Sequence, residues 1–191
     1  MTTVYFVRHC KSNSKNHDDL SRELTEQGLK DRELVTRFFA DKEIGAVLSS
    51  PYKRSIDTVR PVADERDLEI RTYIDLRERE TGQGWIEDFL GYVKAQWTDM
   101  TYKLPEGESL LDVQKRNIAV LNEIVREYKG QNIVIGSHGT ALSTIVNYYD
   151  PSFGYDEFYE IIDIMPWIVA FEFDENGNFT DLRTFIPGQD C

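Results

Sequence analysis

The chain has 191 residues, a length that favours a single domain over residues 1–191. Apolar side chains make up 40% of the residues and charged side chains 29%, a composition that excludes disordered, collagen-like and coiled-coil proteins. With 22 basic and 34 acidic side chains the formal charge is -12. This charge argues against nucleic acid or an anionic membrane as a partner, because both require clustered lysine and arginine.

The sequence gives no sign of membrane insertion or secretion. No stretch approaches the roughly 18 consecutive apolar residues that a membrane span needs. The two cysteines, Cys10 and Cys191, are too few for a disulfide framework, and the first residues lack the basic and long apolar regions of a secretion signal. A cytoplasmic location is therefore expected.

The first half of the sequence predicts alternating strands and helices. Runs of β-branched and aromatic residues predict strands, and apolar residues at helical spacing predict helices. In chain order, these elements are a strand at 3–7, a helix at 26–41, a strand at 46–49, a second helix and a strand at 69–72. Ser50 and Pro51 are predicted to begin the second helix, which places Arg54 in its first turn.

The second half continues this alternation and ends in a hairpin. Residues 85–102 are rich in aromatics and are expected to form short helical pieces over the edge of the sheet. A helix at 109–128 follows, capped by Ser109 and Asp112. The remaining elements are a strand at 132–136, a helix at 140–148 and strands at 168–173 and 179–185. Asn176-Gly177 predicts an antiparallel turn between the last two strands. We therefore expect an α/β three-layer sandwich with a mostly parallel central sheet, an antiparallel edge strand and helices on both faces.

Two of the three histidines directly follow predicted strands. His9 lies after the strand at 3–7 beside Arg8, and His138 lies after the strand at 132–136. Because ligands of open α/β sheets bind beyond the carboxyl ends of the strands, we expect these side chains and Arg54 to share one crevice. Such a positive pocket suits a small dianion such as phosphate, which arginine binds in a bidentate manner. The amides after His138, at a helix start, are additional candidates for anion binding.

Six short motifs occur in a fixed order and carry a family resemblance. They are Val7-Arg8-His9-Cys10, Leu24-Thr25-Glu26-Gln27-Gly28, Ser49-Ser50-Pro51-Tyr52-Lys53-Arg54 with Thr58, Leu76-Arg77-Glu78 with Gly82, Gly107-Glu108-Ser109 with Asp112 and Arg116, and Ser137-His138-Gly139. Together they resemble the motifs of the histidine phosphatase superfamily, also called the phosphoglycerate mutase-like superfamily. The motifs span residues 4–139, and the chain resembles the short, single-domain phosphatase branch.

The resemblance implies a phosphohistidine mechanism. His9 would attack phosphorus through an unprotonated imidazole nitrogen, and nearby arginines would help to keep that imidazole neutral. Arg8, Arg54 and His138 would bind the oxygens of the transferring phosphoryl group. Glu78 would protonate the leaving oxygen and then deprotonate the attacking water.

Some assignments have rivals. Glu80 is the alternative proton donor because residues 78 and 80 face the same way in an extended segment, although the family pattern Leu-x-Glu favours Glu78. Cys10, Lys11 and Lys15 depart from the family pattern. We interpret Cys10 as a buried inert thiol rather than an acidified one, and the two lysines as solvated rather than as charges at the pocket mouth. No ligand cluster for a metal is evident, and neither a metal nor another cofactor is expected.

The leading functional hypothesis is a phosphoric monoester hydrolase, independent of metal and cofactor. Only about 30 residues separate Glu78 from Ser109, whereas mutases of this family carry a longer segment there, so a phosphoglycerate mutase-type transfer is the runner-up. A non-catalytic phosphate-binding regulatory module is the third hypothesis. The expected partner is a small phosphorylated substrate, with a phosphoprotein as the alternative. The sequence does not establish the substrate's identity or whether the chain forms a homodimer.

Overall fold

The computed structural model describes residues 1–82, 84 and 86–189, so Trp85 and Cys191 lie outside the described residues. One six-stranded sheet has the order β3-β2-β4-β1-β5-β6. Its strands are β1 (Thr2–Arg8), β2 (Ala46–Ser49), β3 (Ile70–Thr72), β4 (Asn132–Ser137), β5 (Trp167–Phe173) and β6 (Phe179–Phe185).

Parallel pairs form the first part of the sheet and antiparallel pairs its far edge. β1 pairs with β4, β4 with β2, and β2 with β3, all in parallel, whereas β5 pairs antiparallel with both β1 and β6. The α/β class, with a mostly parallel sheet and an antiparallel edge, is therefore confirmed. The parallel strands end together, which brings the residues after β1, β2 and β4 to one rim.

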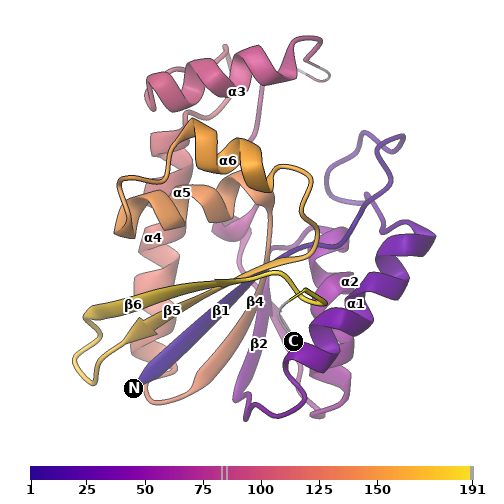
Figure 1. Ribbon diagram of the computed structural model, residues 1–191, viewed down its shortest axis with the longest axis vertical. Coiled ribbons are helices and arrows are strands. Elements are labelled where there is room, and N and C mark those ends of the chain that lie inside the picture. The colour runs from indigo at the N-terminus through magenta and orange to yellow at the C-terminus, as the bar shows by residue number, and fades with distance from the viewer. Residues whose placement is uncertain (83, 85, 190–191) are drawn as a thin grey trace.

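Helices cover both faces of the sheet, as Figure 1 shows, with α1 and α2 on one side and α4 and α5 on the other. The helices are α1 (Glu26–Phe38), α2 (Lys53–Asp64), the 3-10 turn η1 (Ile74–Leu76), α3 (Phe89–Thr98), α4 (Leu110–Glu127), α5 (Gly139–Tyr149) and α6 (Tyr155–Ile161). None of the described helices is both long and apolar enough to cross a membrane.

The two-residue period of β1 explains how one strand serves two cores. Val4 and Phe6 belong to the core under α4 and α5, whereas Tyr5 and Val7 belong to the core under α1 and α2. All four side chains are buried, which explains why the sequence of the central strand is a continuous apolar run. Burial on both faces fixes the register, and with it the direction of the residues that follow the strand.

The boundaries of two helices differ from the sequence expectation. The helix at 26–41 ends at Phe38, and the second helix begins at Lys53 without a side-chain cap. Ser50 was expected to cap that helix, but its hydroxyl lies 2.6 Å from Nε2 of His138 and accepts a hydrogen bond from the backbone N–H of Tyr52. A tertiary partner thus replaces the local cap.

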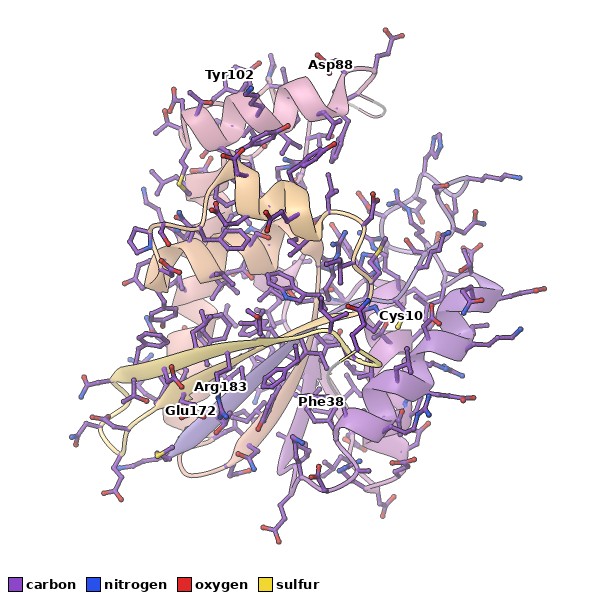
Figure 2. All side chains as sticks on the ribbon, in the orientation of Figure 1. Cys10, Phe38, Asp88, Tyr102, Glu172 and Arg183 are labelled. Atoms are coloured by element: carbon purple, nitrogen blue, oxygen red, sulfur yellow. The ribbon has the colours of Figure 1, made fainter. Side chains whose placement is uncertain are left out.

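The aromatic stretch and the segment after α5 also differ in detail. The described residues 86–102 contain one helix, α3, which packs against α6. Asp88 and Tyr102, which flank α3, lie far from Glu172 and Arg183 on the sheet (Figure 2). The seven-residue helix α6 was not predicted from the sequence.

Candidate active site

The register between β1 and β4 brings the two strand-end histidines together. Arg8 pairs with Ser137 across the parallel ladder, and the backbone N–H of His9 donates to the Ser137 carbonyl at 3.0 Å. The ring centroids of His9 and His138 lie 5.5 Å apart. Two residues separated by more than a hundred positions therefore face the same small volume.

The hydrogen bonds of His9 indicate which ring nitrogen carries the proton. Nδ1 lies 2.7 Å from the carbonyl oxygen of Cys10, which can only accept, so Nδ1 is the protonated nitrogen. Nε2 then keeps its lone pair and accepts from Nε of Arg54 at 3.2 Å. Burial, followed by the charge of Arg54, holds the pKa of His9 well below its usual value. His9 is therefore a neutral imidazole at pH 7, with a lone pair on Nε2.

His138 is also buried, and its second nitrogen has no partner. Its Nε2 contacts Ser50 Oγ, whereas Nδ1 has no hydrogen-bond partner among the described residues. Burial and the charge of Arg54 hold the pKa of His138 well below its usual value. A neutral ring with one unused nitrogen can still hydrogen-bond a ligand.

Arg54 is held by a loop residue that the sequence did not single out. The first turn of α2 places this side chain beside His9, where it is 2% exposed. Its Nη1 donates to the backbone carbonyl of Asp19 at 2.8 Å, and its Nη2 lies 3.1 Å from the Asp19 carboxylate. Asp19 thus neutralises the arginine and fixes its plane.

Arg8 is anchored by carbonyl oxygens of the segment that follows α6. Nη1 donates to the carbonyls of Ile161 and Ile164 at 2.6 and 3.1 Å, and Nη2 donates to that of Ile162 at 2.8 Å. Nε is buried and has no hydrogen-bond partner among the described residues. A Cβ on Gly139 would lie only 3.0 Å from this Nε, so the glycine after His138 leaves room for the guanidinium.

Glu78 occupies the amides at the start of α5. Its Oε1 accepts from the backbone N–H groups of Arg79 and Ala141 at 2.7 and 3.0 Å, and its Oε2 accepts from that of Thr140 at 3.0 Å. The sequence expectation that these amides bind an external anion is corrected, since the protein's own carboxylate binds them. Glu78 is thereby aimed at the same rim as His9.

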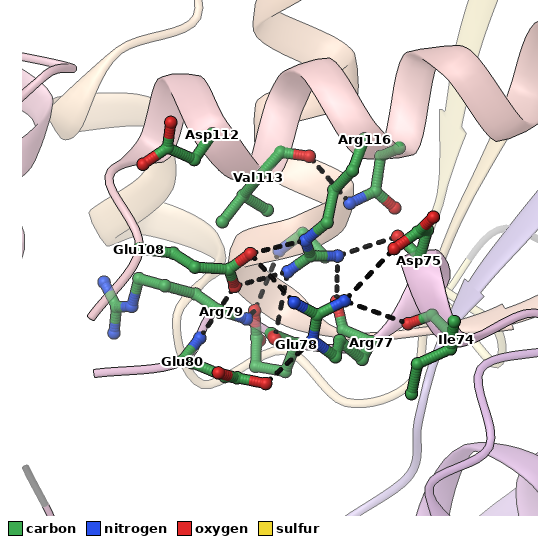
Figure 3. A network of polar contacts seen from close by, with 12 residues as sticks. Ile74, Asp75, Arg77, Glu78, Arg79, Glu80, Glu108, Asp112, Val113 and Arg116 are labelled. Atoms are coloured by element: carbon green, nitrogen blue, oxygen red, sulfur yellow. Dashed lines mark hydrogen bonds and ion pairs between the residues drawn. The ribbon is translucent and has the colours of Figure 1, made fainter. Parts of the chain in front are cut away.

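A partly buried ionic network holds the backbone around Glu78 (Figure 3). Arg116 donates to the carbonyls of Asp75, Arg77 and Glu78 at 2.7, 2.8 and 3.1 Å. Its guanidinium also binds the Glu108 carboxylate at 2.7 and 2.8 Å. Glu108, which directly precedes the capping Ser109, makes its side-chain contacts with this network.

The rival donor Glu80 lies in a different position from Glu78. Its carboxylate binds Nε of Arg77 at 2.8 Å, and its backbone N–H donates to Glu108 at 3.0 Å. Glu80 is half exposed and does not line the cavity that contains His9. The geometry therefore favours Glu78 over Glu80 for contact with a ligand.

A cavity of about 290 Å³ opens at three of the five predicted site residues, and Arg8 and His138 are not among the residues that line it. Three of its lining residues are His9, Arg54 and Glu78, and the others include Ser12, Asp19, Arg22, Arg79, Thr81, Phe89 and Thr140. A larger cavity of about 630 Å³ lies between α1 and the C-terminal segment and is lined by none of the five predicted site residues. We take the smaller cavity as the site because the polar groups converge there.

A family comparison identifies the scaffold. The family described as "Histidine phosphatase superfamily (branch 1)" matches residues 4–178. The chain belongs to this superfamily. The resemblance seen in the sequence motifs is thereby confirmed, and the expectation of a phosphatase-class enzyme is confirmed at the level of the family.

Several histidine phosphatase relatives are similar over most of their length. A protein named "Probable phosphoglycerate mutase GpmB" from Yersinia pestis is 28% identical over 161 residues, which are 77% of this chain and 74% of the relative. The structure of Bacillus stearothermophilus YhfR aligns with a TM-score of 0.76 at 23% identity and covers 94% of this chain and 95% of that one. A phosphoserine phosphatase from Entamoeba histolytica, solved with 3-phosphoglyceric acid, gives 0.75 at 20% identity, with 95% and 96% covered.

The departures from the histidine phosphatase motif lie away from the cavity. Cys10 is fully buried beside α1 and α2 (Figure 2), and burial raises the pKa of its thiol to about 12. The interpretation as an inert thiol is therefore supported. Lys11 and Lys15 are exposed and do not line the cavity. No group of three or more metal-binding side chains occurs in the described part of the chain.

Proposed function

We propose that this protein is a metal-independent phosphatase that hydrolyses a phosphate monoester through a phosphohistidine on His9, with Glu78 as general acid and base. The observation that carries the proposal is the state of His9, a buried neutral imidazole with a lone pair on Nε2. Glu78 lines the same cavity. Nucleophile and proton donor therefore face one bound ester.

The first chemical step would transfer the phosphoryl group to the enzyme. Nε2 of His9 would attack phosphorus while the bond to the ester oxygen breaks, and protonated Glu78 would deliver its proton to that leaving oxygen. Arg54 would bind the equatorial oxygens together with two groups that have buried unpartnered nitrogens, Nε of Arg8 and Nδ1 of His138. The alcohol would then leave the cavity.

The second step would return the enzyme to its starting state. The Glu78 carboxylate would take a proton from water as the water oxygen attacks phosphorus, and the bond to Nε2 would break. Inorganic phosphate would leave, with His9 neutral and Glu78 protonated again. Neither step of this reaction uses a metal or an organic cofactor.

The cavity size supports a small substrate over a phosphoprotein. About 290 Å³ lies near the lower end of the roughly 300–1,000 Å³ usual for small-molecule sites. The Entamoeba relative is a phosphoserine phosphatase solved with 3-phosphoglyceric acid, and a mycobacterial structural neighbour is a glucosyl-3-phosphoglycerate phosphatase. These names support a phosphorylated small molecule as the substrate.

The Yersinia relative's name supports a second candidate, a phosphoglycerate mutase. A mutase must retain the phosphorylated intermediate away from water. Between Glu78 and Ser109 the described residues contribute one helix, α3, which argues for hydrolysis. Incubation with 3-phosphoglycerate separates the two reactions, since a mutase yields 2-phosphoglycerate and a phosphatase yields inorganic phosphate.

The mechanism is tested by hydrolysis of para-nitrophenyl phosphate in excess EDTA. We expect turnover and an acid-labile phosphoenzyme in the wild type, and neither in His9→Ala. His17→Ala is the matched control, because this exposed histidine does not line the cavity, and it should retain both. Turnover that survives His9→Ala would refute the mechanism, and a wild type that binds phosphate without any turnover or labelling would favour a regulatory module.

A further inference from the structure

Arg79 is a buried cation in the candidate active-site cavity to which the proposed mechanism gives no role. It follows Glu78 directly in the chain, is 6% exposed and lines the same cavity as His9. Because it contacts residues of α3, it stands on the side of the cavity formed by that helix. His9, after β1, and Arg54, in the first turn of α2, line the same cavity, so the cavity extends from these two residues to Arg79.

The charge of Arg79 has no ion-pair partner among the described residues. The one hydrogen bond of its guanidinium to a described residue runs from Nη1 to Oε1 of Gln96 at 2.6 Å, and its Nε is buried without a partner among those residues. The neighbouring Arg77 and Arg116 both bind carboxylates of the protein. Buried cations are normally paired, because an unpaired one loses hydration without compensation. Arg79 is therefore the exception within its own loop.

The surroundings of Arg79 hold the guanidinium in place without neutralising it. Gln96 is fully buried, and its Nε2 donates to the carbonyls of Tyr102 and Glu108, both at 3.0 Å, so its Oε1 must face Arg79. The ring centroids of Tyr92 and Phe89 lie 5.0 and 5.8 Å from Cζ of Arg79. The partners in direct contact are neutral, and the carboxylates of Glu78 and Glu108 act on the charge only through space, so no ion pair with a described residue occupies the guanidinium.

We propose that Arg79 binds a carboxylate on the organic part of the substrate, so that the preferred substrates are phosphate monoesters of small carboxylic acids. This inference rests on the proposed function and deepens it. The single unpaired charge on Arg79 matches the single charge of a carboxylate, whose two oxygens fit the planar guanidinium. The phosphate would lie at His9 and Arg54, and the carboxylate would lie on the α3 side.

The test compares two phosphate esters that differ mainly in the presence of a carboxylate. In 3-phosphoglycerate a carboxylate stands where glycerol 3-phosphate has a hydroxymethyl group. Dissociation constants are measured calorimetrically in the His9→Ala background, so that the result does not depend on turnover. We expect 3-phosphoglycerate to bind about 10- to 100-fold more tightly, the range for one charge-assisted contact.

Arg79→Met removes the charge and keeps an unbranched apolar chain, and it should bring the affinity ratio to within about threefold of one. Arg79→Lys keeps a positive charge without the planar guanidinium, so it should lower the affinity ratio only part-way. If the Arg79→Met protein does not fold, Arg79→Lys takes its place in the test. Arg60→Met, an exposed position on α2, is the matched control and should leave the ratio unchanged. The inference would be overturned if the His9→Ala protein bound 3-phosphoglycerate and glycerol 3-phosphate equally well. It would also be overturned if the preference for 3-phosphoglycerate survived Arg79→Met.

The binding test of Arg79 can fail independently of the test of the proposed function. Hydrolysis of para-nitrophenyl phosphate that depends on His9, without a carboxylate preference in binding, would refute the role of Arg79 alone. Absence of turnover and labelling on every ester would refute the proposed function, and the binding ratio would still decide whether Arg79 holds a carboxylate.

Discussion

The two buried histidines should make the stability of the fold depend on pH in a range where carboxylates contribute little. Burial holds the pKa values of His9 and His138 well below 6.5, whereas in the unfolded chain each regains its ordinary value. Below pH 6.5 the unfolded state therefore binds protons that the native state does not bind. Stability must fall as the pH falls, until the native pKa values are reached.

The size of the effect follows from linkage. From pH 6.5 to pH 5 one histidine that stays neutral in the native state reduces the free energy of unfolding by about 1.6 kcal/mol, and two reduce it by about 3 kcal/mol. Against a typical total of about 5–15 kcal/mol, this loss is large enough to measure.

The assay is urea unfolding of the wild type, His9→Asn, His138→Asn and the double variant at several pH values in this range. Each variant is compared with itself across pH, so a constant loss of stability from the substitution cancels. We expect each single variant to lose about half of the pH dependence and the double variant to lose nearly all of the histidine contribution. A double variant with the same pH dependence as the wild type would refute the reasoning.

Three further outcomes follow from contacts around the site. Arg116→Met removes three hydrogen bonds to the backbone around Glu78, so kcat/KM for para-nitrophenyl phosphate should fall tenfold or more, about 1.4 kcal/mol, with the far-ultraviolet circular dichroism unchanged. Gly139→Ala places a Cβ 3.0 Å from the Arg8 guanidinium and should lower both the melting temperature and phosphate affinity; unchanged calorimetry would contradict this. Cys10 should resist iodoacetamide at pH 8 in the native protein and react in urea, because the pKa of its buried thiol is raised to about 12; rapid native alkylation would show an accessible thiolate.

The local pattern of the sequence was sufficient to predict the strand-end residues. Apolar runs locate β1 and β4, and the rule that ligands bind beyond parallel strand ends selects His9 and His138. The register then brings them together, as the 5.5 Å separation of their rings shows. Such residues are predictable because their position depends on the strand immediately before them.

The residues that the sequence analysis missed depend on partners far along the chain. Asp19 belongs to a polar loop and is distinguished only by its contact with Arg54, 35 residues away. The Ser50 hydroxyl was expected to cap a helix, but its partner His138 is 88 residues away. No periodicity or local motif encodes these pairings, since they arise only when the layers are packed together.

The central position of β1 has a consequence for synthesis of the protein. This first strand pairs with β4 and β5, and Arg8 is anchored by carbonyls 153–156 residues later in the chain. At translation rates of about 5–20 residues per second, roughly 8–30 s pass between synthesis of Arg8 and of its last partner. Until residues 132–173 are made, a nascent chain carries His9 without both neighbours of its first strand, and the anchor of Arg8 is completed only with Ile164. Assembly of the candidate active site is thus a late event in synthesis, although its first residues are among the earliest to be made.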